Sequence, residues 1–317
     1  MKLSQETLKK FIKGALTIRK EGAYICPLRY EEAQIEMFKE ADPGWHWRSQ
    51  FSSTTRIELV TDATELRLDY FATDFSSSDC FFDLYIDGVL HEVWKVRKFN
   101  FDRVNFALPE GKKLVTIYLP TDCHIKIKNF NINGGYKSVK DKGEKVLIIG
   151  DSITQGYGPF MSGATYVSAL QRKTGYNIVA QGIGGLPFKE CAVYKGEYEP
   201  DKIIVFLGTN YYESPSYDYE KETSAFFKKL NETWGDKEIV YISPLWRDND
   251  VIWDRFVWCR EVATNEALKY DNITVIDGFD LVPHVHECFV DKIHPNAYGC
   301  ELMATTLAYI LKEIKFE

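Results

Sequence analysis

The pattern of hydrophobic and polar positions changes near residue 51 and again near residue 140. Between these points, from about residue 51 to 132, short segments alternate polar and apolar residues, and turn signals such as Asp87-Gly88 separate them. Alternation places every second side chain on one face of a strand, so these segments predict an antiparallel β-sandwich of jelly-roll type. The expected strands are 56–60, 65–71, 82–86, 104–108, 114–118 and 124–128.

After residue 144 the pattern predicts strands that alternate with helices. Continuous apolar runs, which are typical of buried parallel strands, occur at 145–149, 177–181, 202–207, 238–243 and 273–276. Helices are expected near 163–173, 218–234, 254–269 and 296–314. This alternation predicts a three-layer α/β domain, in which helices cover both faces of a mostly parallel sheet.

These patterns predict two domains. We expect an N-terminal region with the β-sandwich at 1–135, a polar, glycine-containing linker at 136–144, and the α/β domain at 145–317. The first 50 residues predict helices at 6–16 and 30–40, and they could pack on either domain.

Composition and charge narrow the range of partners. The 317 residues are 45% hydrophobic and 27% charged, as in ordinary globular proteins, and the net charge of -7 comes without a basic stripe. We therefore expect no nucleic-acid partner. No apolar run reaches the length of a bilayer span and the N-terminus lacks an apolar signal core, so we expect no membrane association and a cytoplasmic location. Seven singly spaced cysteines predict free thiols.

The first strand of the α/β part leads into a candidate nucleophile. The apolar run at 146–149 stops at Gly150, and Asp151 and Ser152 follow at once. Ligands in open α/β sheets bind beyond the carboxyl ends of the strands, so Ser152 occupies a position suited to a reactive hydroxyl. The alternative is that Asp151 or Ser152 only caps the next helix.

Other strand ends supply the groups that a nucleophilic serine needs. A serine hydroxyl requires a base, and His294 precedes the last helix with Asp291 three residues upstream, close enough to orient the imidazole. Donors for a developing oxyanion follow two other strands, namely the glycines within 182–185 and the amide of Asn210. Each of these groups alone could serve only a turn or a helix cap.

Together these residues resemble the four sequence blocks of the SGNH (GDSL-type) hydrolases. The blocks are Gly150-Asp151-Ser152-Ile153-Thr154-x-Gly156, the glycines at 182–185, Gly208-Thr209-Asn210 and Asp291-x-x-His294-Pro295. They occur in the family's order, and the resemblance covers about residues 145–315. It implies that Ser152 is the nucleophile, His294 the general base and acid, and Asp291 the orienting acid. We expect no cofactor and no metal ion.

The resemblance also implies an oxyanion hole made by the Ser152 N–H, a glycine N–H and the Asn210 side chain. Gly185 is our first choice for the glycine and Gly182 the second, because the end of the family's block matches Gly185 best. Tyr211 stands where the family often has Asp, which affects the loop rather than the role of Asn210.

The N-terminal part carries a weaker resemblance. Phe82-Asp83-Leu84-Tyr85 is similar to the core of GxDLY-type domains that precede some SGNH esterases, with Phe81 in place of the glycine. The two-part plan is also similar to that of jelly-roll-plus-SGNH carbohydrate esterases. We therefore expect a serine esterase that removes small acyl groups, acetyl above all, from a carbohydrate through an acyl-Ser152 intermediate. Tyr211 and Trp246 follow strand ends and are expected to contact this substrate.

Several alternatives remain open from the sequence. The protein could be a carbohydrate-binding protein with an inert hydrolase domain, or an acyltransferase or thioesterase with the same triad. His284, His286 and Cys288 are metal-ligand types close together, although we expect a surface loop there. A dinucleotide site is disfavoured because Gly182-x-Gly184-x-x-Pro187 lacks the third glycine of the fingerprint. The sequence leaves the oligomeric state open.

Overall fold

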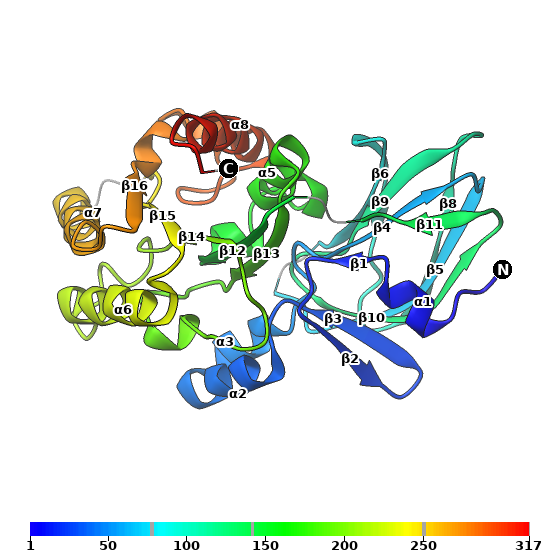
Figure 1. Cartoon of the computed structure of the whole chain (residues 1–317), viewed down its shortest axis with the longest axis horizontal. Helices are drawn as coiled ribbons and strands as arrows, with labels where there is room; N and C mark the ends of the chain where they lie inside the picture. The colour runs from blue at the N-terminus through cyan, green and yellow to red at the C-terminus, as the bar shows by residue number, and fades with distance from the viewer. Residues whose placement is uncertain (77–78, 141–142, 249–251, 317) are drawn as a thin grey trace.

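The computed structural model describes residues 1–76, 79–140, 143–248 and 252–316. Two antiparallel sheets form the N-terminal part, on the right of Figure 1, and a parallel sheet with helices forms the C-terminal part on the left. The predicted combination of a β-sandwich with an α/β domain is therefore confirmed. Residues 141–142 of the predicted linker lie outside the described residues.

The sandwich consists of two sheets that pack face to face. One sheet has the order β1-β4-β9-β6-β7, with β11 paired to β4, and the other has the order β2-β3-β10-β5-β8. The strands of the first sheet are β1 (Ile12–Lys13), β4 (Arg56–Thr61), β6 (Phe81–Ile86), β7 (Val89–Lys95), β9 (Lys113–Tyr118) and β11 (Tyr136–Ser138). Those of the second are β2 (Thr17–Glu21), β3 (Tyr24–Leu28), β5 (Glu65–Thr73), β8 (Phe101–Ala107) and β10 (His124–Ile132).

Alternating side chains fill the space between these two sheets. Ile57 and Leu59 of β4 belong to the same buried apolar cluster as Leu66 and Leu68 of β5, which lies in the other sheet. At the predicted hairpin between β6 and β7, Asp87 and Gly88 have φ values of 49° and 82°. Two consecutive positive φ angles are those of a type I′ turn, which matches the twist of the paired strands.

The α/β domain contains five parallel strands in the order β13-β12-β14-β15-β16. The strands are β12 (Lys145–Gly150), β13 (Asn177–Gly182), β14 (Lys202–Phe206), β15 (Glu238–Ile242) and β16 (Ile273–Ile276). Its main helices are α5 (Tyr166–Thr174), α6 (Tyr219–Trp234), α7 (Trp253–Ala267) and α8 (Ala297–Glu313). Short 3₁₀ turns are η1 (Ser162–Ala164), η2 (Glu190–Ala192), η3 (Gly278–Asp280) and η4 (His286–Cys288).

Successive residues of the interior strand β12 face opposite helical layers. Val146 and Ile148 of β12 pack with α5 and α8, whereas Leu147 and Ile149 pack with α6 and α7. This division explains the continuous apolar run in the sequence, because both faces of β12 are covered (Figure 1).

The N-terminal region contributes to both domains. Helix α2 (Glu32–Ala41) and helix α3 (Pro43–Ser49) lie beside the α/β domain in Figure 1, and Phe38 and Trp45 join the apolar cluster that contains Leu147. By contrast, helix α1 (Gln5–Lys9) belongs to the sandwich, where Leu8 joins the apolar cluster. This helix ends earlier than the sequence predicted, because strand β1 follows it and pairs with β4.

Strand β6 contacts the α/β domain through the motif noted in the sequence. The Asp83 carboxylate accepts a hydrogen bond of 2.6 Å from the Gly163 N–H. The Arg172 guanidinium lies 4.6 Å from the ring centre of Tyr85 and 5.7 Å from that of Tyr118. Burial raises the pKa of Asp83 to about 7. This motif therefore places a buried acid and the ring of Tyr85 where the domains meet, and Tyr118 of the neighbouring strand β9 adds a second ring.

Two further findings concern membrane contact and thiols. Within the described ranges, no helix combines the length and the apolar character needed to cross a membrane. The seven cysteines have free thiols, as predicted.

Candidate active site

In the turn after β12, Asp151 caps the next helix, and the neighbouring Ser152 is the candidate nucleophile. Asp151 is the N-cap of the short helix α4 (Ser152–Gln155), and its carboxylate accepts a hydrogen bond of 3.0 Å from the Ile153 N–H. Burial raises the pKa of Asp151 to about 7, because one backbone N–H replaces the water that a carboxylate prefers. The cap is therefore Asp151, and the Ser152 hydroxyl remains available for another partner.

That partner is His294, which the last loop brings to the serine. Ser152 Oγ lies 2.8 Å from His294 Nε2, and His294 Nδ1 lies 2.8 Å from Asp291 Oδ2. With the ring proton on Nδ1, Nε2 is free to accept the proton of the serine. The structure thus brings the three predicted triad residues into one hydrogen-bonded chain.

Asp291 is fixed by the loop that carries the histidine. Its Oδ1 atom accepts hydrogen bonds from the N–H groups of Ile293 at 2.7 Å and His294 at 2.8 Å. Partial burial raises the pKa of Asp291, but these hydrogen bonds and the imidazole outweigh it and hold the pKa below its ordinary value. The carboxylate is therefore ionised near neutral pH, as an orienting acid must be.

Ser152 and His294 line a cavity of about 230 Å³. Gly185 lies there with a φ of 79°, a conformation that favours glycine. Asn210 lies there too, and its amide nitrogen donates one hydrogen to the Leu186 carbonyl at 3.2 Å, which leaves its second hydrogen for a ligand. The predicted oxyanion groups thus lie around the same cavity.

The second-choice glycine has a different position. Gly182 ends strand β13, and a Cβ atom there would lie 2.2 Å from the backbone nitrogen of Gln155. This glycine lets helix α4 pack closely on β13. Only Gly185 of the two lines the cavity as described.

Gln155 forms a link that the sequence did not reveal. Its amide nitrogen donates to Asp122 Oδ1 at 2.7 Å, and its amide oxygen accepts from the Gly184 N–H at 2.7 Å. Asp122 belongs to the sandwich, whereas Gly184 precedes Gly185. A residue read only as the variable position of the serine block therefore connects the sandwich to the glycine loop.

Four more residues line the cavity without having been predicted, namely Arg48, Ser76, Tyr157 and Ile293. Arg48 comes from α3 and Ser76 follows β5, so both belong to the N-terminal region. Tyr157 follows α4, and its ring centre lies 4.6 Å from that of His294. Tyr157 directly follows the serine block, and this position could have indicated it. No sequence signal links Arg48 or Ser76 to a serine at position 152.

Tyr211 and Trp246, which were expected to contact the substrate, do not line the described part of the cavity at Ser152. Tyr211 is 46% exposed, and its ring centre lies 5.5 Å from that of Tyr217. Trp246 stacks on His284 with ring centres 5.3 Å apart. Neither residue lines the cavity at Ser152. Their contact with a substrate stays a prediction.

The histidines considered as metal ligands have other partners. His284 Nε2 lies 2.9 Å from the Phe279 carbonyl, and His286 Nδ1 lies 2.9 Å from Asp248. Within the described ranges, the group whose metal-ligand atoms lie within 4.8 Å of one another consists instead of Glu21, Cys26 and His124.

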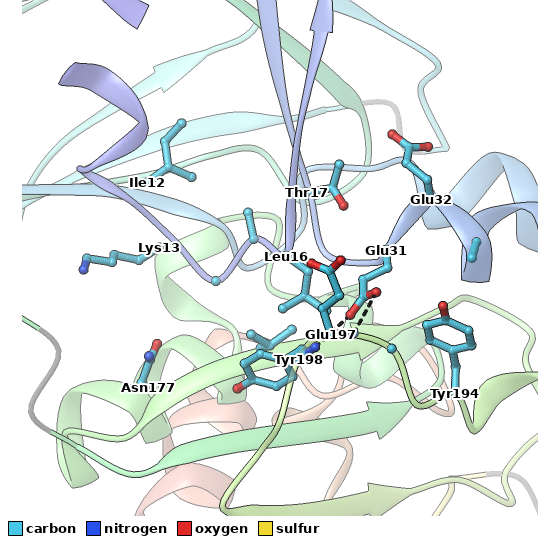
Figure 2. A pocket seen from close by; sticks show the side chains of 15 residues that line it. Ile12, Lys13, Leu16, Thr17, Glu31, Glu32, Asn177, Tyr194, Glu197 and Tyr198 are labelled. Atoms are coloured by element: carbon cyan, nitrogen blue, oxygen red, sulfur yellow. Dashed lines mark hydrogen bonds between the residues drawn. The ribbon is translucent and has the colours of Figure 1, made fainter. Parts of the chain in front are cut away.

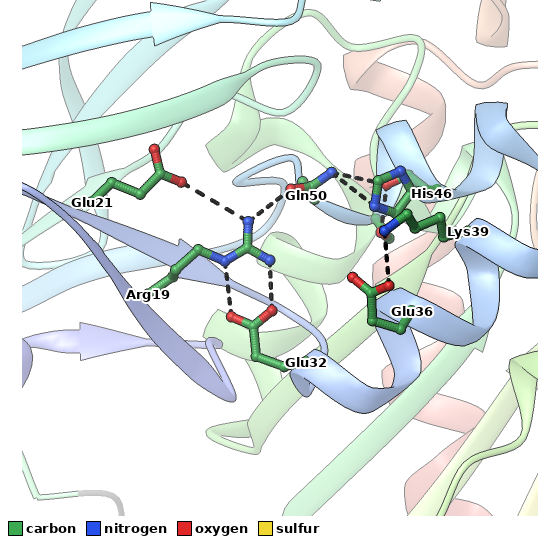
Figure 3. A network of polar contacts seen from close by, with 8 residues as sticks. Arg19, Glu21, Glu32, Glu36, Lys39, His46 and Gln50 are labelled. Atoms are coloured by element: carbon green, nitrogen blue, oxygen red, sulfur yellow. Dashed lines mark hydrogen bonds and ion pairs between the residues drawn. The ribbon is translucent and has the colours of Figure 1, made fainter.

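Positively charged side chains of the protein already surround the Glu21 carboxylate. The Lys126 ammonium forms an ion pair with this carboxylate, and an Arg19 nitrogen lies 3.9 Å from it. Arg19 also donates to Glu32 and Gln50, so it ties strand β2 to helices α2 and α3 (Figure 3). The arrangement favours a structural ion-pair network over a metal centre.

A larger cavity of about 750 Å³ lies where the sandwich meets the α/β domain (Figure 2). In it the Glu31 carboxylate accepts hydrogen bonds from the N–H groups of Glu197 at 3.1 Å and Tyr198 at 2.9 Å. Its lining, as far as the chain is described, includes no serine, histidine or cysteine. Size alone therefore does not identify the reactive site in this protein.

Comparison with known proteins agrees with the sequence blocks. Residues 148–302 match the model of the GDSL-like lipase/acylhydrolase family. No curated protein matches the chain.

Solved structures with similar architecture span nearly the whole chain. The salicylyl-acyltransferase SsfX3 from a tetracycline biosynthetic pathway is 19% identical, with a TM-score of 0.76 and coverage of 96% of this chain and 94% of that one. An acetyl xylan esterase, Est2A, from the rumen bacterium Butyrivibrio proteoclasticus is 17% identical, with a TM-score of 0.68 and coverage of 99% and 98%.

A third similar structure contains a bound oligosaccharide. It is a family two carbohydrate esterase from Clostridium thermocellum in complex with cellohexaose, 17% identical, with a TM-score of 0.67 and coverage of 83% of this chain and 93% of that one. At these identities the likeness establishes the shared fold, and activity has to be argued from the residues of the site.

Proposed function

We propose that this chain, whose residues 148–302 form a domain of the GDSL-like lipase/acylhydrolase family, is a serine esterase that releases small acyl groups from a carbohydrate. The observation that carries the proposal is the hydrogen-bonded chain from Ser152 through His294 to Asp291, at 2.8 Å for each link, beside a cavity. These residue types in this order meet the requirement of an activated hydroxyl with an oriented base.

In the acylation step, Ser152 Oγ attacks the carbonyl carbon of the ester while its proton passes to His294 Nε2. The carbonyl oxygen becomes an oxyanion that accepts hydrogen bonds from the N–H groups of Ser152 and Gly185 and from the Asn210 amide. Asp291 stabilises the imidazolium that forms. The intermediate then collapses as His294 gives its proton to the leaving alcohol oxygen, and an acyl-Ser152 ester remains.

In the second step, water replaces the alcohol. His294 removes a proton from the water, and the hydroxyl oxygen attacks the acyl carbon of the Ser152 ester. The same donors stabilise the second oxyanion. Collapse returns the proton from His294 to Ser152 Oγ and releases the carboxylic acid, so the enzyme is restored.

The size of the cavity supports a small acyl group. Its volume of about 230 Å³ is below the roughly 300–1,000 Å³ of pockets that enclose drug-sized ligands. A long acyl chain would extend beyond it, whereas an acetyl group and part of the alcohol would fit. This comparison favours acetyl esters.

Tyr157 supports a ring-shaped alcohol. Its ring lies against His294, which protonates the leaving alcohol, and it is 37% exposed. A partly exposed aromatic ring on that side offers an apolar surface to a sugar. The similar structures of an acetyl xylan esterase and of a carbohydrate esterase in complex with cellohexaose also support a carbohydrate as the alcohol.

Acyl transfer is the second candidate. Of the three similar structures described above, the salicylyl-acyltransferase has the highest TM-score. The acyl-Ser152 intermediate is common to both reactions, and only the acceptor differs. A thioesterase would use the same intermediate. A carbohydrate-binding protein with an inert hydrolase domain would form no acyl-enzyme at all.

The direct test is a panel of acetylated saccharides together with 4-nitrophenyl esters of increasing chain length, with Ser152→Ala as the control. We expect release of acetate by the wild type, none by the variant, and activity that falls with chain length. A preference for long chains would contradict the carbohydrate acetylesterase. Appearance of the acyl group on an added alcohol in place of free acid would support transfer.

A further inference from the structure

The cavity at Ser152 has one permanently charged side chain in its described lining, and it is Arg48. The lining contains no aspartate, glutamate or lysine among the residues that the structure describes. Apart from His294, its other polar side chains are neutral hydroxyls and amides. The cavity therefore carries a positive charge next to the proposed nucleophile.

Arg48 makes few contacts with its guanidinium group. Its Nη1 atom donates to the Gly44 carbonyl at 3.3 Å, and the guanidinium carbon lies 5.3 Å from the ring centre of Trp47. No described carboxylate forms an ion pair with it, in contrast to Arg19, which lies 2.6 Å from Glu32 (Figure 3). A planar guanidinium with unused donors suits a carboxylate, which it binds through two parallel hydrogen bonds.

The buried carboxyl of Asp122 does not serve as the missing partner. Burial raises the pKa of Asp122, whereas hydrogen bonds from Gln155 and Ser76 and the charges of Arg29 and Arg48 lower it. Its Oδ1 atom is taken by the Gln155 amide at 2.7 Å. Asp122 therefore influences Arg48 through its charge without a direct hydrogen bond among the described residues, and the guanidinium keeps donors for a molecule in the cavity.

The backbone of Arg48 is held by a second arginine, Arg29, which is buried. Arg29 is fully buried and donates to the Arg48 carbonyl at 3.2 Å and to the Gly182 carbonyl at 2.7 Å. This ties helix α3 to the end of β13. A Cβ atom at Gly184 would lie 3.2 Å from Arg48 Nε, so the Arg48 side chain rests on the residue that precedes Gly185.

We propose that Arg48 binds a carboxylate of the substrate, so that the preferred substrates are esters that carry a carboxylate, such as an acetylated sugar acid. This inference rests on the proposed esterase function and adds to it the charge class of the substrate. The carboxylate can belong to the alcohol, as in a uronic acid, or to the acyl group, as in a hemisuccinate. Both place an anion beside the scissile bond.

Matched pairs of esters test this inference. The alcohol pair is 4-acetoxybenzoate and its methyl ester, and the acyl pair is mono-4-nitrophenyl succinate and 4-nitrophenyl butyrate. We expect Arg48→Gln to lower kcat/KM for the charged member of one pair by roughly 10- to 100-fold, the range for a hydrogen bond to a charged group. The neutral member should change less than about two-fold, and Arg48→Lys should retain part of the preference.

The pair that responds identifies the side of the ester that bears the carboxylate. Arg97→Gln is the control, since it removes one positive charge from a side chain that is 76% exposed and does not line the cavity. A parallel fall for charged and neutral esters would assign Arg48 a structural or oxyanion role and overturn the inference. No change for any ester would overturn it too.

A binding measurement separates this inference from the esterase itself. The affinity of 4-acetoxybenzoate and of mono-4-nitrophenyl succinate for Ser152→Ala is compared, by titration calorimetry, with that for the Ser152→Ala/Arg48→Gln double variant. Loss of affinity on removal of Arg48 supports the inference even if the wild type hydrolyses no ester. Equal affinity overturns it even if the wild type is an active esterase.

Discussion

The Gln155 amide nitrogen lies 2.7 Å from Asp122 Oδ1, so the serine turn of the α/β domain is held by a buried acid of the sandwich. The other end of the same amide accepts the Gly184 N–H. The glycine loop of the candidate oxyanion hole is thus positioned from the N-terminal domain. The sandwich therefore contacts, through Gln155, the loop that carries Gly185.

Replacing Gln155 with Ala should therefore impair turnover more than substrate binding. The Gly184 N–H would lose its acceptor, and a small shift of the neighbouring Gly185 would misplace an oxyanion donor. We expect kcat on 4-nitrophenyl acetate to fall by about 10- to 100-fold with a smaller change in KM. Gln5→Ala, which removes a partly buried glutamine that donates a hydrogen bond to the Ala23 carbonyl far from the cavity, is the control. An unchanged kcat in a folded variant would show that the link has no catalytic importance.

Asp291→Asn should reduce kcat strongly while the fold is retained. The asparagine oxygen can still accept the N–H groups of Ile293 and His294, but its amide would face His294 Nδ1 and favour the wrong tautomer. We expect a fall of about 10²- to 10⁴-fold, measured by steady-state kinetics. Asp248→Asn is a matched control, because Asp248 forms a similar pair with His286 outside the cavity. Comparable losses in both variants would argue against a specific role for Asp291.

Asp151→Asn should be far milder. Asparagine is also a good N-cap and can accept the Ile153 N–H, and burial already favours the neutral form of Asp151 by raising its pKa to about 7. We expect kcat to remain within about ten-fold of the wild-type value, a loss of no more than roughly 1.4 kcal/mol of transition-state stabilisation. A folded variant as inactive as Ser152→Ala would mean that Asp151 takes part in the reaction.

Asp83→Asn should alter the pH dependence of stability. Burial raises the pKa of Asp83 from 3.8 to about 7, so between these values the folded protein holds a proton that the unfolded chain has released. The contribution of this group is therefore present below pH 4 and lost as pH rises towards 7, by at most about 1.4 kcal/mol per pH unit.

The measurement for Asp83 is denaturant unfolding from pH 4 to 8. The free energy of unfolding of Asp83→Asn, relative to the wild type, should increase as pH rises through this range. Comparison with the wild type cancels other titrating groups, such as His124, whose pKa burial lowers to about 4. Asp236→Asn, at an exposed position, should give a constant difference. A constant difference for Asp83→Asn as well would contradict the buried-acid account.

Much of the fold could be predicted because burial left a clear pattern. The run at Val146–Ile149 is buried on both faces, and the alternation of β5 matches a strand with one face in the core. Strand β7 was missed for the converse reason. Val89, Leu90 and Val93 are exposed apolar residues, so no contrast between a buried and an exposed face marks the strand.

The candidate site could be predicted only as far as short motifs carry it. Ser152, Asp291 and His294 each follow a strand or precede a helix in a recognisable block, and the structure brings them together. Arg48 lies more than a hundred residues from Ser152 along the chain, and it reaches the cavity because Arg29 ties α3 to β13. Such long-range packing has no local sequence signature.

The most direct test of the account is covalent labelling of Ser152 by a fluorophosphonate, read by peptide mass spectrometry. Attack by an activated serine oxygen displaces fluoride, so the wild type should carry one phosphonyl group on Ser152. His294→Ala should label far more slowly, Ser152→Ala should not label, and Ser216→Ala, at a position outside the described lining of the cavity, should label like the wild type. A folded wild-type protein that stays unlabelled, or that labels equally after Ser152→Ala, would contradict the proposed esterase.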